Sequence, residues 1–377
     1  MDPTADQVSH DQFDLVVVGA GIVGLGAALE GVDRGLRVAV VDRSAAIVGS
    51  SVRNFGHVGV TGQSGAALDY ALESRDRWLR VGVEAGIRVS QAGGAIVARG
   101  ADELALLAMF AEERGTDQVV LATAEEMTDA TPVRDPAVTG GAFLPLDLQV
   151  DPRRAAPALA RWLESRGVSF FWSRAVLGVE PGVVHTAAGD LRAAAVVVAV
   201  NFDVDQFYPE LAARAGIRRC ALDMLALDWS GQRPLDAPLL TGSSMLRYSA
   251  FAGLAGFAEL RARYEREFPS VVALDINQMY SQRPGGDLIV GDTHYRGDAV
   301  EPFQNERSFD ELLALTRELF GIDDLRVVER WQGVYASAPA EFFVETPAPG
   351  VRAVSVTTGI GMTTGLGLAA SVVRDLT

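Results

Sequence analysis

Three glycines and one acidic residue near the start of the chain have the spacing of a dinucleotide-binding turn. The apolar run Leu15-Val-Val-Val18 leads into Gly19, Gly21 and Gly24, and a second apolar run ends at Asp42. We expect Gly19 to permit a tight turn, Gly21 to let the backbone approach a pyrophosphate, and Gly24 to let a helix pack closely on the strand. That helix would point its free N–H groups at the phosphates, and the Asp42 carboxylate would accept both ribose hydroxyls.

A second glycine cluster lies near the other end of the chain. The segment 359–363, Gly-Ile-Gly-Met-Thr, follows the apolar run 351–356 and precedes a final apolar helix. A nicotinamide dehydrogenase needs only one such turn. Here a second helix start would place N–H groups beside the part of a reduced isoalloxazine that carries negative charge. The two turns together favour FAD over NAD, although a helix that merely packs on the sheet remains the alternative for 359–363.

Composition restricts the classes of function. The 377 residues are 49% hydrophobic with a net charge of −16, which suits two domains and argues against binding of nucleic acid or an anionic membrane surface. The 4 histidines and 1 cysteine lack the spacing of a metal cluster, so we expect no metal. The single cysteine, Cys220, excludes an internal disulfide and fits a reducing cytoplasm, and the first ten residues lack a signal-peptide pattern.

The basic residues of this chain are all arginine. None of the 33 residues counted as lysine or arginine is lysine, so no side chain can form the Schiff base that pyridoxal phosphate requires. Any side chain that binds an anion by its positive charge must therefore be arginine or protonated histidine.

The pattern of apolar residues predicts the elements that position these turns. Residues 1–12 are expected to be a flexible leader and 13–42 a strand–helix–strand unit. The run 193–200 is apolar throughout, which is typical of a strand buried on both faces, so it should rejoin the sheet begun near residue 14. Helical periodicity over 66–86 predicts one buried face made of Leu68, Leu72, Leu79 and Val83.

The remaining predicted elements alternate between strands and helices. Asp151-Pro152 is expected to start a helix, because proline is favoured in the first turn. The predicted helices cover 101–114, 155–166, 257–268 and 309–320. The predicted strands cover 94–98, 176–179, 183–186, 191–200, 221–229, 277–283, 287–292 and 351–356.

This order of elements predicts an α/β fold with a discontinuous Rossmann-like FAD-binding domain. An α+β substrate domain built on an antiparallel sheet is expected to be inserted into it. The predicted FAD-binding domain comprises 13–90, 150–205 and 325–377, and the predicted substrate domain comprises 91–149 and 206–324.

From residue 13 onward the chain resembles the FAD-dependent superfamily of glycine, sarcosine and D-amino-acid oxidases. The features that carry the resemblance are the N-terminal glycine turn, the run 196–200 and the C-terminal Gly-x-Gly-Met-Thr. Five shorter motifs are similar to a bacterial branch of FAD-dependent oxidoreductases that is associated with aminophosphonate metabolism. They are Ser51-Val-Arg-Asn-Phe-Gly-His57, Gly62-Gln63, Gly291-Asp-Thr-His294, Arg330-Trp-Gln-Gly-Val-Tyr335 and 359–363.

The resemblance implies that non-covalently bound FAD oxidises the C–N bond of a small anionic amine. The branch implies an aminoalkylphosphonate, such as 2-aminoethylphosphonate or an N-methyl or hydroxy relative. A hydride would pass to the flavin, the imine would hydrolyse, and oxygen or another acceptor would reoxidise the flavin, with oxygen giving hydrogen peroxide.

The resemblance also implies roles for individual residues. His57 and Tyr335 are the catalytic candidates, and the substrate-binding candidates are Arg53, Arg283, His294 and Trp331. The expected cofactor-binding residues are Gly19, Gly21, Ile22, Val23, Gly24, Asp42, Arg43, Ser50, Ser51, Asn54, Phe55, Gly56, Val176, Gly359, Ile360, Gly361, Met362 and Thr363.

The chain departs from the superfamily at three points. Tyr335 stands where amino-acid oxidases commonly carry the arginine that holds the substrate carboxylate, so the usual bidentate clamp is missing there. The lysine by which sarcosine oxidases activate oxygen is absent, which leaves His57 or another cation for that role. Asn201 stands where a glycine is frequent, which puts a glycine-dependent cofactor contact in doubt.

Two further readings stay open at this point. The chain could be a glycine, sarcosine or D-amino-acid oxidase in which another arginine holds the carboxylate. It could also be a flavin-binding subunit without catalytic activity, although the segment expected to line the flavin keeps polar and cationic residues.

Overall fold

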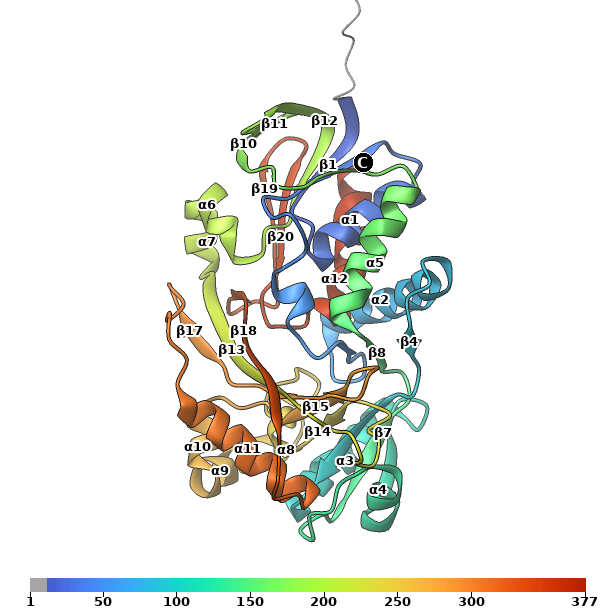
Figure 1. Cartoon of the computed structure of the whole chain (residues 1–377), viewed down its shortest axis with the longest axis vertical. Coiled ribbons are helices and arrows are strands. Elements are labelled where there is room, and N and C mark those ends of the chain that lie inside the picture. Colours follow the sequence, from blue (N-terminus) through green and yellow to red (C-terminus); the bar gives the residue numbers. More distant parts are fainter. Residues whose placement is uncertain (1–11) are drawn as a thin grey trace, which may run out of the picture.

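An eight-stranded sheet carries the N-terminal glycine turn and forms the upper part of the molecule in Figure 1. The structure, a computed structural model, describes residues 12–377. The predicted leader lies outside these residues except for Gln12, which already belongs to the first strand. Five strands run parallel in the order β20-β12-β1-β2-β9: Val351–Val356, Gly189–Val198, Gln12–Val18, Val38–Val41 and Ser169–Phe171. The antiparallel strands β10 (Val176–Glu180), β11 (Val183–Thr186) and β19 (Phe342–Ala348) complete the sheet.

The central strands are apolar at every position because both faces of the sheet are covered. Leu15 and Val17 of β1 pack into a core with the helices on one face, whereas Val16 and Val18 pack into a second core on the other. Successive side chains of a strand point to opposite faces, so a buried parallel strand has no polar alternation. The predicted strand at 193–200 is confirmed as the second half of β12 and its C-terminal extension.

Four helices cover the first face of this sheet: α1 (Ile22–Asp33), α2 (Gly65–Glu84), α5 (Pro152–Ser165) and α12 (Gly361–Leu376). The predicted start of α5 is confirmed, because the Asp151 side chain accepts a hydrogen bond from the Arg153 N–H at 3.1 Å. The opposite face is covered in part by η2 (Asn201–Asp203), α6 (Val204–Phe207) and α7 (Pro209–Ala215).

The predicted buried face of α2 is wrong. Leu72 and Val83 are 40% and 87% exposed, and the buried side chains are instead Ala67, Ala71, Ser74, Trp78 and Val81. These residues recur every three or four positions, as one helical face requires. Small residues occupy the face because α2 packs closely on α12, where the Gly367 N–H donates to the Ser74 hydroxyl at 2.8 Å.

A nine-stranded sheet, antiparallel except where β14 pairs with β5, forms the lower part of the molecule (Figure 1). Its strands are β5 (Gly94–Ala98), β6 (Val120–Thr123), β7 (Gly140–Leu144), β13 (Arg218–Leu227), β14 (Leu239–Leu240), β15 (Met279–Gln282), β16 (Leu288–Gly291), β17 (Tyr295–Gly297) and β18 (Val327–Ser337). The helices packed around it are α3 (Ala101–Arg114), α4 (Ala124–Ala130), α8 (Gly242–Met245), α9 (Phe257–Glu267), α10 (Pro269–Ala273) and α11 (Glu306–Phe320).

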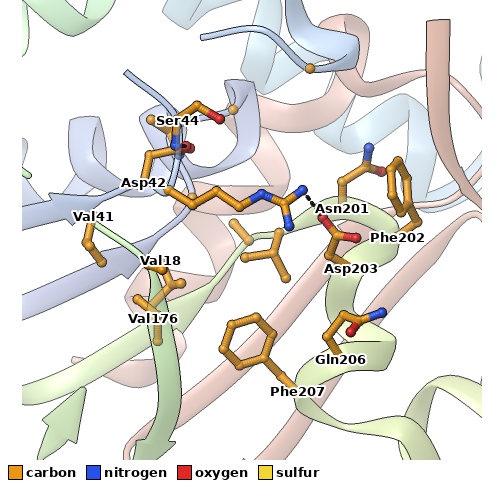
Figure 2. Close-up of a pocket in the computed structure, with 18 of the residues that line it drawn as sticks. Val18, Val41, Asp42, Ser44, Val176, Asn201, Phe202, Asp203, Gln206 and Phe207 are labelled. Carbon is orange, nitrogen blue, oxygen red and sulfur yellow. Dashed lines mark hydrogen bonds and ion pairs between the residues drawn. The ribbon is translucent and has the colours of Figure 1, made fainter. Parts of the chain in front are cut away.

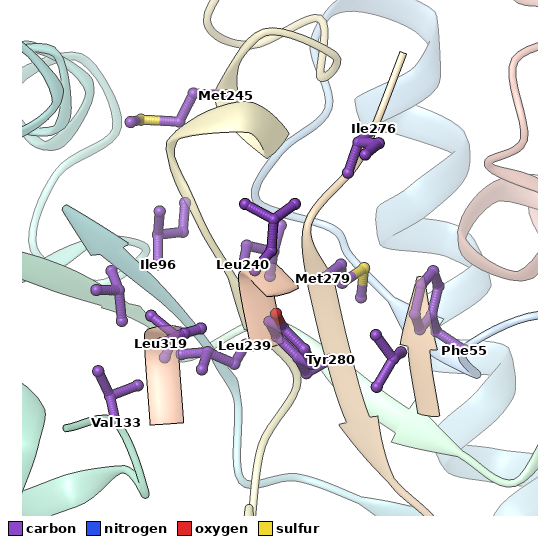
Figure 3. Close-up of a cluster of buried hydrophobic side chains, with 14 of the residues drawn as sticks. Phe55, Ile96, Val133, Leu239, Leu240, Met245, Ile276, Met279, Tyr280 and Leu319 are labelled. Atoms are coloured by element: carbon purple, nitrogen blue, oxygen red, sulfur yellow. The ribbon is translucent and has the colours of Figure 1, made fainter. Parts of the chain in front are cut away.

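Apolar side chains from distant segments form the core beside this second sheet (Figure 3). Ile96 of β5, Leu240 of β14 and Tyr280 of β15 lie in one cluster with Leu319 of α11, and Phe55 reaches the same cluster from the segment after η1 (Ser50–Val52). The mixed α/β fold with a mainly antiparallel second sheet is therefore as predicted.

The interval 325–337 differs from its predicted place. It carries β18, which pairs with β13 from Arg218↔Ser337 to Leu227↔Val327 and so belongs to the second sheet. The reason is visible in its composition, since Glu329-Arg330-Trp331-Gln332 lacks the continuous apolar run of a central parallel strand. The other predicted domain boundaries stay a prediction.

Three short strands form a small third sheet, in the order β3-β8-β4: His57–Val58, Leu148–Val150 and Val89–Ser90. Across residues 12–377, no helix has the length and apolar character needed to cross a membrane.

Candidate functional site

A cavity of about 1020 Å³ opens at the carboxyl ends of β1 and β2 (Figure 2). Its walls include the turn Val18–Gly21, the loop after Asp42, the start of β10 and the segment Ala199–Tyr208. In open α/β sheets, ligands bind in this crevice beyond the carboxyl ends of the strands.

The glycine turn has the geometry that its sequence predicts. Gly19 has φ +101°, and a Cβ at this position would lie 2.4 Å from the Ala199 carbonyl oxygen. A Cβ at Gly24 would lie 1.9 Å from the Gly19 oxygen, so α1 can approach the turn only without a side chain there. Gly24 therefore supports the turn by packing and does not itself line the cavity.

Asp42 lies in the cavity wall and also holds the turn in place. One carboxylate oxygen accepts from the Ala20 N–H and the other accepts from the Ser44 N–H, both at 2.8 Å. Each oxygen keeps a second lone pair, so the carboxylate can still accept hydroxyl groups from a ligand. The position of Asp42 thus suits the predicted ribose contact.

The N-terminus of α1 faces the same space. The Ser51 hydroxyl accepts from the Ile22 N–H at 2.9 Å, and a Cβ at Gly21 would lie 3.3 Å from that hydroxyl. The bare backbone at Gly21 leaves the start of the helix open to the cavity, where an anion would be stabilised.

Asn201 has a positive φ and makes a specific set of hydrogen bonds. Its φ is +59°, in the left-handed region that asparagine tolerates better than most residues. Its side-chain oxygen accepts from the Ala336 N–H at 2.7 Å, and its amide group donates to the Val334 carbonyl at 3.3 Å. Asn201 therefore turns the chain at the cavity wall and ties it to β18.

A narrower cavity of about 100 Å³ adjoins the first cavity, and the lining residues that the two share include Gly21, Ser51 and Asn201. The second glycine cluster lines it through Gly359, Gly361 and Met362. Gly359 has φ +83°, and a Cβ there would lie 3.1 Å from the Tyr335 ring. The two glycine clusters thus meet around connected cavities, although they lie at opposite ends of the chain.

Most predicted cofactor residues line these two cavities: Gly19, Gly21, Ile22, Val23, Asp42, Arg43, Ser50, Ser51, Asn54, Val176, Gly359, Gly361 and Met362. Phe55, Gly56, Ile360 and Thr363 do not. The Phe55 ring packs in the core beside the second sheet, and the Thr363 hydroxyl accepts from the Gly59 N–H at 3.0 Å.

Arg43 and Asp203 form an ion pair at 2.5 Å on the cavity wall, drawn as the dashed line in Figure 2. Arg43 follows β2 and Asp203 belongs to η2, so this pair joins the two walls of the cavity.

The predicted catalytic residue His57 lies outside the three cavities described in this subsection. Its side chain is 5% exposed, and its Nε2 lies 2.8 Å from a carboxylate oxygen of the buried Asp147. The other oxygen of Asp147 accepts from the N–H and the hydroxyl of Thr61, both at 2.9 Å. This placement favours a structural role for His57, and its catalytic role stays a prediction.

The predicted catalytic residue Tyr335 lines the narrow cavity and also a third cavity of about 480 Å³. Burial raises the pKa of the Tyr335 phenol above its ordinary value, so the hydroxyl stays protonated and can donate a hydrogen bond at neutral pH. Tyr335 therefore separates the glycine-lined cavity from the third cavity.

The predicted substrate residue Arg53 lines the first two cavities but not the third, and its guanidinium donates to the Gln332 carbonyl at 3.1 Å. Arg283 pairs with Asp287 and lies 3.6 Å from Glu329, outside all three cavities. The structure thus brings Arg53 to the cofactor side and leaves Arg283 apart from the site.

Trp331 also lies outside the three cavities. Its indole N–H donates to the Arg53 carbonyl at 3.3 Å, and the Arg153 guanidinium lies 4.9 Å from the centre of its ring. The cation–π contact and the hydrogen bond indicate that Trp331 holds the Arg53 segment in position.

The predicted substrate residue His294 belongs to a buried polar cluster beside the third cavity. Its Nδ1 lies 2.8 Å from the Asp275 carbonyl oxygen, which can only accept, so Nδ1 carries the proton. Burial and the nearby Arg247 lower the pKa of His294 well below its ordinary value. Its imidazole is therefore neutral and offers no positive charge to an anion.

Two acids in this cluster have opposite pKa shifts. Burial raises the pKa of Asp292 to about 7, although Arg247 opposes the shift. Burial also acts on Asp275, but Arg247 and Arg296 outweigh it and lower the pKa of that carboxyl to about 2. At neutral pH the Asp275 carboxylate is thus ionised, whereas Asp292 holds a proton more readily than an ordinary aspartate.

Sequence reasoning missed two sets of site residues. Asp203 and Tyr208 follow a buried strand and line the first cavity, and the rule that ligands bind at the carboxyl ends of parallel strands could have found them. Arg247, Asp275 and Arg296 come from separate segments of the second domain and lack a common local motif.

The lining of the first cavity suits a nucleotide cofactor. The Tyr208 hydroxyl in the first cavity is buried and has no hydrogen-bond partner among residues 12–377, so a ligand oxygen could satisfy it. Cys220 is buried in β13 and does not line the three cavities, and burial raises the pKa of its thiol. The described part of the chain has no group of histidine, cysteine or acidic residues arranged to hold a metal.

Comparison with known proteins agrees with this geometry. The family model described as "DAO: FAD dependent oxidoreductase" matches residues 14–374. No curated protein sequence matches the chain. Among solved structures, L-proline dehydrogenase from P. horikoshii has a TM-score of 0.81 at 17% identity, and glycine oxidase from Geobacillus kaustophilus has 0.77 at 19% identity. Each comparison covers 97% of this chain and 94% of the other.

A third similar structure is iminodiacetate oxidase from Chelativorans sp. BNC1. It has a TM-score of 0.75 at 16% identity, covering 96% of this chain and 94% of the other. At this level of identity the solved structures establish the shared fold.

Proposed function

The chain belongs to the DAO family of FAD dependent oxidoreductases, and we propose that it oxidises the C–N bond of a small anionic amine. The proposed substrate class is an aminoalkylphosphonate, such as 2-aminoethylphosphonate or an N-methyl or hydroxy relative. One observation supports the proposal most directly: Tyr335 is a shared wall between the glycine-lined cavity and a polar cavity that could hold a small anion.

The residues that would hold FAD form two groups. Asp42, Ser51 and the N-terminus of α1 suit the ribose and the pyrophosphate. Gly359 and Gly361, before α12, suit the redox-active ring, because the start of that helix lies at the narrow cavity. When bound, FAD supplies an acceptor for the hydride that leaves the carbon next to the amine nitrogen.

The chain's own residues would orient the amine and keep water away from that carbon. The protonated Tyr335 hydroxyl can contact the amine end of a substrate. Asp292, whose pKa is raised by burial, belongs to the buried cluster beside the third cavity without lining it, and it is the candidate to accept an ammonium proton. Release of that proton leaves the neutral amine, whose nitrogen lone pair allows a hydride to depart from the adjacent carbon. Water then hydrolyses the resulting imine to a carbonyl compound and the free amine.

We propose oxygen as the electron acceptor, with hydrogen peroxide as its product. The chain has no lysine. Any positive charge that activates oxygen must therefore come from an arginine or from protonated His57. Arg53 is the arginine at the narrow cavity. We also propose a cytoplasmic location, from the single cysteine.

The second candidate function is a glycine, sarcosine or D-amino-acid oxidase. The observation that favours it is the shared fold with glycine oxidase and iminodiacetate oxidase. Against it stands Tyr335 at the place where such enzymes carry an arginine. A flavin-binding subunit without activity is the third candidate, and an intact but unreactive flavin would support it.

The test is anaerobic bleaching of the flavin absorbance of the purified holoprotein. The panel consists of 2-aminoethylphosphonate, its N-methyl and 1-hydroxy forms, glycine, sarcosine and D-alanine. We expect the aminophosphonates to bleach the flavin and the three amino acids to be much slower. Bleaching by the amino acids alone would favour the second candidate, and an absence of bleaching by the whole panel would contradict amine oxidation of these classes.

A further inference from the structure

The third cavity concentrates positive charge in an acidic protein. Arg247, Arg261 and Arg296 line it, and among residues 12–377 Asp275 is the only acidic residue that does so. Its walls therefore carry a formal charge of +2, whereas the whole chain carries −16. A cationic cavity in such a protein attracts an anion, since the walls exclude part of the screening water.

Asp275 holds two of these arginines without using up their donors. One nitrogen of Arg247 lies 2.8 Å from one oxygen of Asp275, and one nitrogen of Arg296 lies 2.6 Å from the other oxygen. Among residues 12–377 these are the only hydrogen bonds of the two guanidinium groups. Each arginine has five N–H donors, so most remain available to a ligand.

The backbone of Asp275 has an unfavourable conformation at the point where its carboxylate meets the two arginines. Its φ is +46°, which is costly for a residue other than glycine. The surrounding structure maintains it at the position where one carboxylate meets both arginines. The result is two guanidinium groups held beside one cavity by a single ionised carboxylate.

Hydroxyl groups complete the polar lining. The Thr358 hydroxyl oxygen is buried and has no hydrogen-bond partner among the described residues. Thr358 lines the third cavity immediately before the glycine cluster at 359–361. A buried hydroxyl without a partner costs free energy, so a ligand oxygen within reach of it would be stabilised.

We propose that this cavity binds the phosphonate group of the substrate through Arg247 and Arg296, with Thr358 as a further donor. This inference rests on the proposed function and identifies the residues that would select its anion. A phosphonate offers three oxygens and up to two negative charges, which matches the +2 lining, whereas a carboxylate offers two oxygens and one charge. The cavity volume of about 480 Å³ is ample for such a group.

This placement also orients the reacting end of the substrate. Tyr335 lines both the third cavity and the narrow cavity. A substrate with its anion beside Arg296 would extend its amine toward Tyr335 and Gly359. Arg53 lies on the cofactor side of Tyr335, so in this proposal it is not the group that binds the anion.

The test uses methylphosphonate, an anion that has no amine and cannot be oxidised. Its binding to the holoprotein is measured by calorimetry, with acetate as the carboxylate comparison. The variants are Arg296→Gln, whose side chain is 40% exposed, Arg247→Gln and Thr358→Val. The matched control is Arg218→Gln, which also removes one charge from the second sheet but has its exposed guanidinium paired with Asp298 away from the cavity.

We expect methylphosphonate to bind more tightly than acetate and Arg296→Gln to weaken its binding by roughly 10- to 100-fold, as for the loss of a charge-assisted hydrogen bond. Arg218→Gln should change the dissociation constant less than twofold. Equal binding of methylphosphonate to the parent and to Arg296→Gln would overturn the proposal, even if Arg247→Gln failed to fold. Amine-dependent bleaching that continues in that case would show that the proposed function survives without this anion site.

Discussion

At the scale of single residues, backbone strain coincides with the candidate sites. Among residues 12–377, three residues other than glycine have positive φ: Ser173, Asn201 and Asp275. Asn201 lies in the wall of the first two cavities and Asp275 in the wall of the third. Such conformations persist where the surrounding structure requires them, and they often occur at functional sites.

Asn201 should matter through both its φ and its side chain. Asn201→Ala loses the bonds to Ala336 and Val334 and places an alanine at φ +59°. We expect a loss of about 2–4 kcal/mol in the free energy of unfolding and weaker FAD binding. Asn201→Gly accommodates the φ and should recover part of the loss. Urea unfolding and FAD titration measure both effects, and equal stability of the alanine and glycine variants would contradict a role for φ.

Asp292 should make stability depend on pH. Its native pKa of about 7 lies above the ordinary value of 3.8 for an aspartate, so between about pH 4 and pH 7 the native state keeps a proton that the unfolded state has lost. Stability due to this group is present at low pH and falls as pH rises through that window. Four groups face Asp292. The Arg247 charge and a hydrogen bond from Asn277 lower its pKa, and the Asp275 charge raises it. The His294 Nε2 lies 3.7 Å from a carboxylate oxygen of Asp292.

The corresponding variant is Asp292→Asn, which cannot ionise. The stability of this variant relative to the parent should increase from pH 5 to pH 8, by at most a few kcal/mol at roughly 1.4 kcal/mol per pKa unit. Thermal unfolding at both pH values is the measurement, and Asp298→Asn, whose side chain is 94% exposed, is the control. A difference that does not change with pH would mean that Asp292 titrates normally.

At the scale of elements, α2 buries a face that begins with small residues and leaves part of its leucine face exposed. Its buried face begins with alanine and serine because α12 lies close against it. Interiors are packed at high density, so added volume on such a face has no room. Leucines 68 and 79 are only partly buried at the edges of this contact.

This packing predicts losses of stability of different size at two adjacent positions of α2. Ala71→Leu should destabilise the protein by about 1–3 kcal/mol, because Ala71 is fully buried and the added methylenes must displace α12. Leu72→Ala should cost less than about 1 kcal/mol, because Leu72 is 40% exposed. The midpoints of urea unfolding compare the two variants. A larger loss of stability in Leu72→Ala than in Ala71→Leu would indicate that the leucine face of α2 is the buried one.

At the scale of the whole molecule, the cofactor cavities join segments from both sheets. The strand β18 belongs to the second sheet, yet its Val334 and Tyr335 lie in the cavities beside the glycine turn of the first sheet. Asn201 links the two by hydrogen bonds. A ligand in these cavities therefore contacts both parts of the fold and stabilises them together.

Removal of FAD should accordingly lower the stability of the entire chain. We expect the apoprotein to unfold at a lower temperature than the holoprotein, and added FAD should raise that temperature as its free concentration increases. At a free concentration about 100 times the dissociation constant, the gain is about 2.7 kcal/mol. Calorimetry should detect one shifted transition, and a transition of the second sheet that does not respond to FAD would contradict the coupling.

The sequence alone determined the nucleotide-binding half because its signals are local. The turn at Gly19–Gly24, the acid at Asp42 and the buried strands depend on neighbours a few residues away or on a two-residue period, and each of them appears as predicted. The same holds for β5, α3 and β11, which begin and end where the patterns indicate.

Only the tertiary structure decided which side chains meet at the candidate substrate site. Arg247, Asp275, Arg296 and Tyr335 lie on different elements, and their proximity depends on the order of strands in the second sheet. The same non-local packing directed Arg283 to Asp287, paired His57 with Asp147 and assigned β18 to the second sheet. Local patterns carry no information about such contacts, because the residues that form them are brought together only when the whole chain folds.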